Sequence, residues 1–111
     1  MTNIALIVIA VIFALASLIK LASTQMALDN FERWGLPDSA RYGIGIIEAG
    51  MAVFAVIALM NPVLAVEVAI ASLVIMAGAL ATHIRVRDEA KEYVPFVFVT
   101  AAAVYILAVN L

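Results

Sequence analysis

The chain has 111 residues, of which 68% are hydrophobic and 13% are charged, with a formal net charge of −2 and a mean hydropathy of +1.21. Soluble domains have about half apolar and about a quarter charged residues, so this composition excludes an ordinary soluble domain and indicates a protein of the lipid bilayer. The lack of cysteine and the single histidine argue against disulfides and against a metal or haem site held by this chain alone, and the lack of a basic tract argues against nucleic-acid binding.

Four apolar segments follow one another and predict four transmembrane helices, at about residues 3–24, 40–60, 62–84 and 94–110. Each is close to the roughly 20 residues that cross about 30 Å of hydrocarbon. The first segment has neither a basic flank nor a cleavage signal, so we expect it to be retained. Because only Asn61 and Pro62 separate the second and third segments, these should form a hairpin. The predicted fold class is all-α: one membrane domain over residues 1–111, a four-transmembrane-helix bundle of antiparallel up-down hairpins.

The basic residues lie on one side of this predicted bundle. The first and third connections contain five of them: Arg33, Arg41, Arg85, Arg87 and Lys91. The second connection and both termini contain no lysine or arginine. The positive-inside rule therefore predicts that the first and third connections are cytoplasmic and that both termini lie on the outer side of a cytoplasmic (inner) membrane.

Three ionisable residues are predicted to share one leaflet inside the bilayer. Glu48 lies about 12 Å into the second span, with Gly45 and Ala52 on its helical face. Small residues let helices approach closely, so we expect this carboxylate to face protein. Lys20 lies at similar depth on the first span and can pair with Glu48 or extend to the lipid headgroups. His83 lies at the same end of the third span. Lys20, Glu48 and His83 thus form the candidate intramembrane polar cluster.

The roles of these residues stay open between structural and chemical interpretations. Glu48 can bond Lys20 or a hydroxyl such as Ser17 across helices, or it can bind a ligand or a proton. His83 can be an interfacial or capping residue, or it can take part in chemistry. Glu67, about 24 Å from His83 along one helix, is expected to be an outer-side acid favoured by the helix dipole. The chain contains no complete catalytic set, so no enzyme activity is predicted.

Several short motifs occur in an order that resembles a known family. They are Ser17-Leu-Ile-Lys-Leu21, Phe31-Glu-Arg-Trp-Gly-Leu-Pro37, Gly45-Ile-Ile-Glu48, the segment Ala79 to His83, and Pro95. Over nearly the whole chain this order resembles the DoxX-like family of small four-helix membrane proteins. The resemblance implies an integral membrane protein. Members of that family have been linked to quinone-connected sulfur oxidation, to membrane oxidoreductase complexes and to chaperone-like assistance of other membrane proteins.

Three functions fit the sequence. The first is an accessory, scaffold or assembly subunit of a larger membrane complex for transport or redox work, since almost no mass lies outside the predicted spans. The second is a quinone-linked redox component, in which Lys20, Glu48 and His83 hydrogen-bond a quinone headgroup while a partner holds the redox cofactor. The third is a small proton-coupled transporter, suggested by size alone. The expected partners are a larger membrane complex or a second copy of the chain, within the lipid bilayer. The sequence predicts no cofactor held by this chain itself and leaves three alternatives open near Glu48: a lipid, a quinone or no ligand.

Overall fold

The computed structural model describes residues 2–86 and 93–110, and every regular element within those ranges is helical. The long helices are α1 (Thr2–Leu21), α3 (Asp38–Met60), α4 (Ala65–Val86) and α5 (Val94–Asn110). A short helix, α2 (Gln25–Trp34), separates α1 from α3, and one 3-10 turn, η1 (Pro62–Leu64), connects α3 to α4. The predicted all-α fold class is confirmed.

The long helices have the composition of membrane spans. α1, α3 and the segment Pro62–Arg85 are long and apolar enough to cross a bilayer. α5 is equally apolar but has 17 residues, which correspond to about 25 Å of helix, slightly less than the hydrocarbon thickness. The chain is therefore a multi-pass membrane protein with three clear spans and a fourth, shorter apolar helix.

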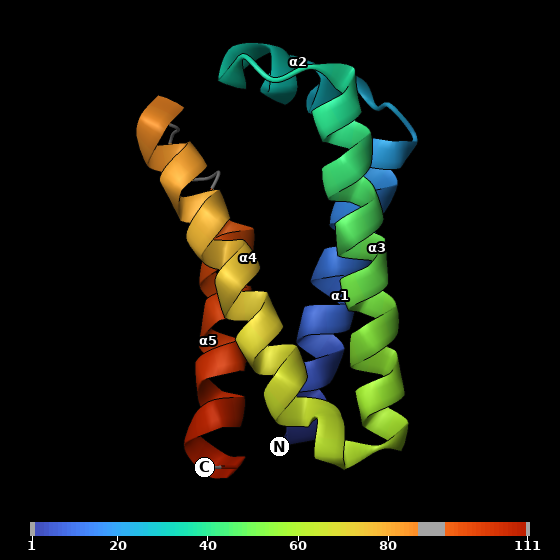
Figure 1. Cartoon of the computed structure of the whole chain (residues 1–111), viewed down its shortest axis with the longest axis vertical. Helices are drawn as coiled ribbons and strands as arrows, with labels where there is room; N and C mark the ends of the chain where they lie inside the picture. Colours follow the sequence, from blue (N-terminus) through green and yellow to red (C-terminus); the bar gives the residue numbers. More distant parts are fainter. Residues whose placement is uncertain (1, 87–92, 111) are drawn as a thin grey trace.

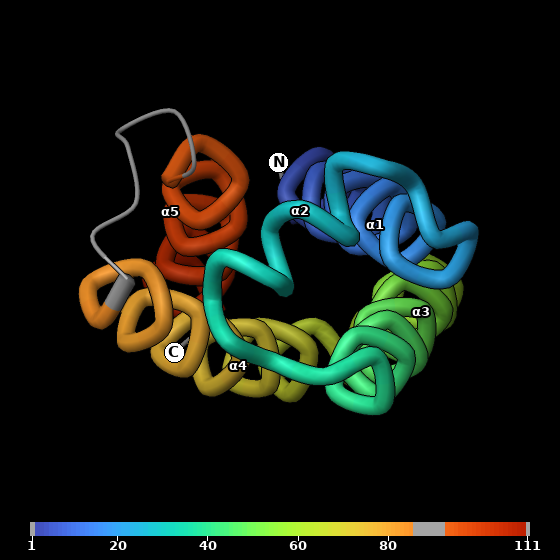
Figure 2. The backbone as a smooth tube through the Cα atoms, turned by 90° about the horizontal axis from the view of Figure 1, so that it is seen from above, coloured from blue at the N-terminus to red at the C-terminus, as the bar shows by residue number. Residues whose placement is uncertain are grey.

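The four long helices form two antiparallel pairs, α1 with α3 and α4 with α5 (Figure 1). The pairs meet near Asn61, where α3 turns into α4, and diverge toward the opposite end, where α2 lies across the bundle (Figures 1 and 2). We call these the turn end and the α2 end. α1 begins and α5 finishes at the turn end, where the Asn110 side-chain amide lies 3.4 Å from the Thr2 hydroxyl.

α2 lies in the first predicted connection, between residues 24 and 40, where the apolar pattern predicts no helix. α1 ends at Leu21, before Ser23 adopts a left-handed φ of 56°. The Thr24 hydroxyl then accepts a hydrogen bond from the Ala27 amide and caps the start of α2. At the other end, Gly35 adopts a φ of 72°, which glycine tolerates at a helix C-terminus. α2 is therefore a separate helix with a side-chain cap at its start and a glycine cap at its end.

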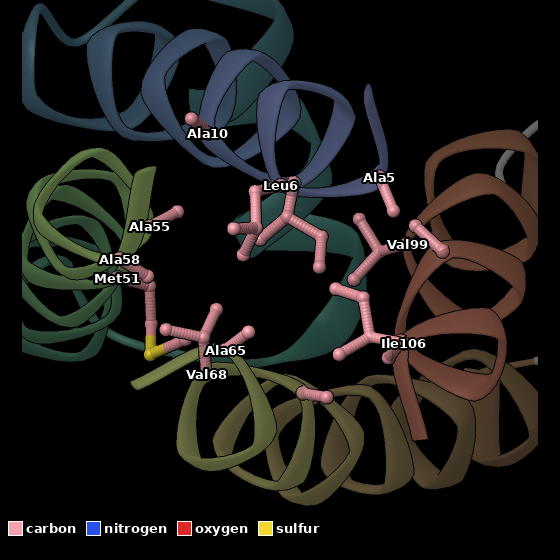
Figure 3. Packing of buried hydrophobic residues seen from close by; sticks show 14 of the residues in the cluster. Ala5, Leu6, Ala10, Met51, Ala55, Ala58, Ala65, Val68, Val99 and Ile106 are labelled. Carbon is pink, nitrogen blue, oxygen red and sulfur yellow. The ribbon is translucent and has the colours of Figure 1, made fainter. Parts of the chain in front are cut away.

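The apolar core lies between the two pairs and takes residues from all four long helices (Figure 3). α1 contributes large side chains such as Leu6 and Ile9, whereas α3 contributes the small Ala55 and Ala58. Many large apolar side chains on the outer faces are exposed, which suits lipid contact. The core thus extends along the bundle from the turn end toward the polar residues of the α2 end.

Candidate functional site

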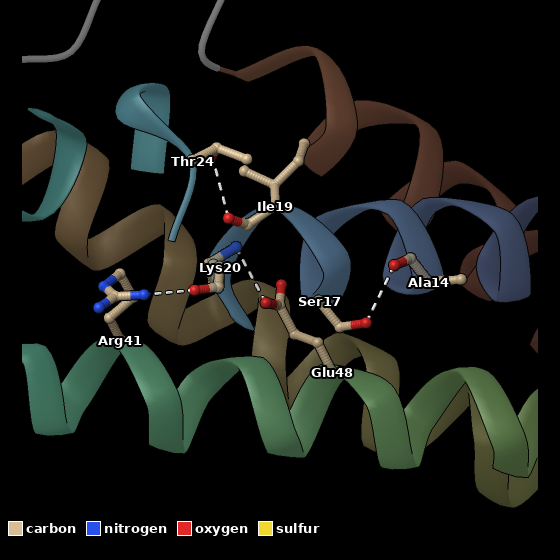
Figure 4. Close-up of polar contacts among 7 residues, drawn as sticks. All are labelled: Ala14, Ser17, Ile19, Lys20, Thr24, Arg41 and Glu48. Carbon is tan, nitrogen blue, oxygen red and sulfur yellow. Dashed lines mark hydrogen bonds and ion pairs between the residues drawn. The ribbon is translucent and has the colours of Figure 1, made fainter. Parts of the chain in front are cut away.

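The structure contains the ion pair expected between the first two spans. Lys20 Nζ lies 2.9 Å from Glu48 Oε1, and the two side chains are 17% and 10% exposed. Lys20 is in the last turn of α1, and Glu48 is in the third turn of α3 (Figure 4). Ser17, the other partner considered for Glu48, instead donates its hydroxyl hydrogen to the Ala14 carbonyl at 2.9 Å. The pair therefore joins α1 to α3 directly.

Close approach of the two helices at this pair depends on Gly45. A Cβ atom added to Gly45 would lie 2.9 Å from Leu21 Cδ2 and 3.3 Å from Lys20 Cβ. Gly43 and Gly50, in contrast, are exposed and have no heavy atom within 4 Å of such a Cβ. Of these three glycines on α3, Gly45 is the one that the α1 contact requires, which places the backbones close enough for Lys20 to reach Glu48.

Arg41 is a second buried charge at the same junction. Its side chain is 2% exposed and donates to the Lys20 carbonyl and, at 2.8 Å, to the Ser23 hydroxyl. The Lys20 carbonyl belongs to the last turn of α1, where carbonyls have no partner within the helix. Arg41 thus caps the C-terminus of α1, and Asp38 lies 3.7 Å away as a more exposed counter-charge.

Tyr42 extends this polar junction toward the surface. The Arg41 guanidinium lies 4.3 Å from the centre of the Tyr42 ring, a distance suited to a cation–π contact. The Tyr42 hydroxyl lies 3.3 Å from the Ser23 hydroxyl. One continuous set of contacts therefore runs from Tyr42 through Ser23 and Arg41 to the backbone of Lys20, whose side chain reaches Glu48.

His83 lies in an aromatic cluster that joins α2, α4 and α5. Its ring is 5.8 Å from that of Trp34 in an edge-on arrangement and 5.0 Å from that of Tyr93. Phe31 and Phe96 extend the cluster at either side. The structure therefore brings Lys20 and Glu48 together and gives His83 a set of aromatic neighbours contributed by other elements.

The remaining predicted site residue is separate from both groups. Glu67 lies exposed in the first turn of α4, at the turn end. An acid in this place is favoured by the helix dipole. Arg87 and Lys91, which the orientation prediction uses, lie outside the described residues.

The chemistry available to the junction follows from its side chains. Lys20 can donate and Glu48 can accept hydrogen bonds, and in the structure the two groups face each other across the α1–α3 interface. Among residues 2–86 and 93–110, no three His, Asp or Glu side chains come together in a way that could hold a metal ion.

Two features of this end do not follow from the sequence pattern. Arg41 lies at the edge of the first predicted connection, yet its side chain is buried in the junction. Trp34, which contacts His83, belongs to α2, for which the apolar pattern predicts no helix. Thr24 as an N-cap and Gly35 before Leu36-Pro37 were the signals that could have revealed α2.

Comparison with known proteins places the chain in one family. A sequence profile of the DoxX-like family matches residues 4–105. No curated protein and no solved structure matches the chain. Because the profile covers nearly all of the helical bundle, including both members of the ion pair, the chain belongs to the DoxX-like family.

Proposed function

We propose that this chain is a non-catalytic subunit or assembly factor of a larger membrane complex, and that it binds a transmembrane helix of its partner between α1 and α3. The observation that carries the proposal is a shallow, open and wholly apolar depression on the outside of this helix pair, which we call the groove. The groove is lined from α1 by Ala10, Val11 and Ala14, and from α3 by Ala52, Val53, Val56 and Ile57.

The residues of the groove suit a helix. Ala10 and Ala14 are four positions apart, the spacing at which small residues let another helix approach closely in a membrane. Ala52 supplies a third small side chain from α3. Val53 also lines the groove and, with an exposed fraction of 59%, is open to contact from outside. A partner helix gains packing contacts here that flexible lipid chains supply less well.

A crosslinking experiment tests this proposal. A photo-reactive amino acid at Val53 in the groove is compared with one at Val104, a similarly exposed position on α5. We expect a discrete crosslinked protein from Val53 but not from Val104, and we expect Ala14→Leu, which fills the groove, to abolish it. Recovery of the tagged chain alone in mild detergent, or crosslinks that are equal at both positions, would contradict the proposal.

We propose further that the protein lies in the cytoplasmic membrane with its α2 end inside. Arg33 and Arg85 are both exposed at the α2 end, as the positive-inside rule requires for a cytoplasmic surface. Asp29 on α2 and Asn61 at the turn end are both exposed and suit single-cysteine labelling. In intact cells, an impermeant thiol reagent should label Asn61→Cys and should label Asp29→Cys only after permeabilisation. The reverse pattern would invert the proposed orientation.

A further inference from the structure

α2 bridges the two helix pairs at the end where they diverge (Figures 1 and 2). Trp34, its last residue, contacts α4. The Trp34 ring lies edge-on to His83, with ring centres 5.8 Å apart. Arg85 donates a hydrogen bond from Nη2 to the Trp34 carbonyl at 3.2 Å. These contacts join α2 to the last turn of α4, and they are non-covalent.

The opposite end of α2 is anchored more firmly. The Thr24 hydroxyl donates to the Ile19 carbonyl at 3.0 Å, and the Ser23 hydroxyl accepts from Arg41. Both residues follow α1 directly, so the start of α2 is tied to the Lys20–Glu48 junction. Both ends of α2 are therefore tied to the α1–α3 pair, at its start through Ser23 and Thr24 and at its end through residues 35–37, which lead into α3. Its contact with α4 is side-chain and hydrogen-bond contact alone.

α2 is a short element with few buried side chains. Its ten residues lie between Ser23 and Gly35, where left-handed φ values separate it from α1 and α3. Only Ala27 and Phe31 within it are buried. Short elements with few buried apolar contacts open locally at lower free energy than the rest of a fold.

We propose that α2 is a movable cap on the bundle, held closed by Trp34 against His83, and that its release admits water to the inner faces of α3 and α4. Glu48 lies buried on α3, in the half of the bundle that α2 covers, so release of α2 would bring water toward the ion pair. The aromatic cluster at Trp34 and the polar junction at Ser23 are the contacts at the two ends of α2. This inference is independent of the proposed partner helix.

Single cysteines test the cap cleanly, because the native chain contains none. Met76 is 8% exposed on α4, seven residues and about 10 Å before His83. Ile9 is fully buried in the core shared by all four helices and serves as the control position. The reconstituted protein with Met76→Cys or Ile9→Cys is treated with an impermeant, charged thiol reagent. Labelling rates are then compared among the parent, Trp34→Ala, Trp34→Phe and His83→Ala.

Release of the cap has a specific signature in these rates. When Trp34→Ala or His83→Ala is added to Met76→Cys, the thiol reagent should label the cysteine about tenfold faster than in the parent background. The reason is that loss of one aromatic contact shifts the local opening equilibrium. Trp34→Phe should stay near the parent rate, and Ile9→Cys should remain protected throughout. Phe98→Ala, which removes an exposed aromatic ring of α5, is the matched control and should change neither rate.

Either of two results would contradict the proposal that α2 is a movable cap. If Met76→Cys labels at the parent rate in Trp34→Ala and His83→Ala, the contact does not control access. If Met76→Cys and Ile9→Cys accelerate together, Trp34 stabilises the whole bundle and does not hold a separate moving part.

Discussion

The α1–α3 pair and the α4–α5 pair are held together by different kinds of contact. Between α1 and α3, an ion pair and the bonds of Arg41 cross the interface, and Gly45 allows close approach. On α4 and α5, the buried side chains are mainly apolar. Two hydroxyls there, Ser72 Oγ and Thr100 Oγ1, are buried and have no hydrogen-bond partner within the described part of the chain.

This difference indicates which contacts fix the positions of the helices relative to one another. Lipid tails are as apolar as the side chains, so apolar contact alone gives little preference for one helix register over another. A buried ion pair and a helix cap have defined partners and fail when a helix slides. We therefore expect the α1–α3 pair to set the register of the bundle and the α4–α5 pair to follow by packing.

On the α1–α3 side, we expect a large loss of stability when the buried Arg41 is replaced by an uncharged residue, as in Arg41→Leu. The change removes the side-chain donor to the Lys20 carbonyl and to Ser23, and leaves that carbonyl with the Ser23 amide alone. We expect a loss of about 2–4 kcal/mol in the free energy of unfolding, measured in detergent, since bonds to charged groups contribute about 1.5–3 kcal/mol each.

Two controls make the Arg41 prediction specific. Arg41→Lys keeps the charge but lacks the planar fork, so it should be intermediate. Arg85→Leu removes an arginine that is exposed, and it should cost less than about 1 kcal/mol. Equal losses for Arg41→Leu and Arg85→Leu would show that burial of Arg41 has no special weight.

The contrast between two glycines of α3 has the next largest expected effect. Gly45→Leu places a side chain against Leu21 and Lys20 and should cost about 1–3 kcal/mol through overpacking. Gly50→Leu points into open space and should be neutral or slightly stabilising, because leucine favours helix more than glycine does. Thermal unfolding of the two variants in the same detergent checks the order. If Gly50→Leu were the less stable variant, the close contact at Gly45 would not limit the packing of α1 against α3.

Ser72→Ala tests the α4–α5 pair and has the smallest expected effect on the free energy of unfolding. The Ser72 hydroxyl is fully buried without a partner among the residues that the structure describes. Its removal should leave the free energy of unfolding unchanged or raise it by up to about 1 kcal/mol, since no hydrogen bond is lost. A loss above about 1 kcal/mol would mean that α4 and α5 also depend on a polar contact.

Much of the fold was predictable because hydropathy alone marks membrane spans. The four apolar segments and the turn at Asn61-Pro62 follow from composition and from proline chemistry. The contact between Lys20 and Glu48 was predictable from matched depth and from Gly45, since an isolated charge is costly in hydrocarbon.

The remaining features depend on where individual helices end. Arg41 is buried because α1 stops at Leu21 and presents the Lys20 carbonyl, which no pattern of charges reveals. The neighbours of His83 depend on Trp34, and hence on a ten-residue helix whose polar residues resemble those of a loop. The opening angle between the pairs is likewise set by tertiary packing and has no local signal.

The central claim is that the Lys20–Glu48 pair fixes α1 against α3, and a double-mutant cycle on unfolding in detergent tests it most directly. Lys20→Met should cost about 3 kcal/mol, because it leaves a buried carboxylate without its cation. Combining it with Glu48→Leu should recover much of that loss, so that the double change costs less than the sum of the two single changes by about 1–3 kcal/mol. Costs that add within about 0.5 kcal/mol would contradict the account, since they would show that the two side chains do not stabilise the bundle through each other.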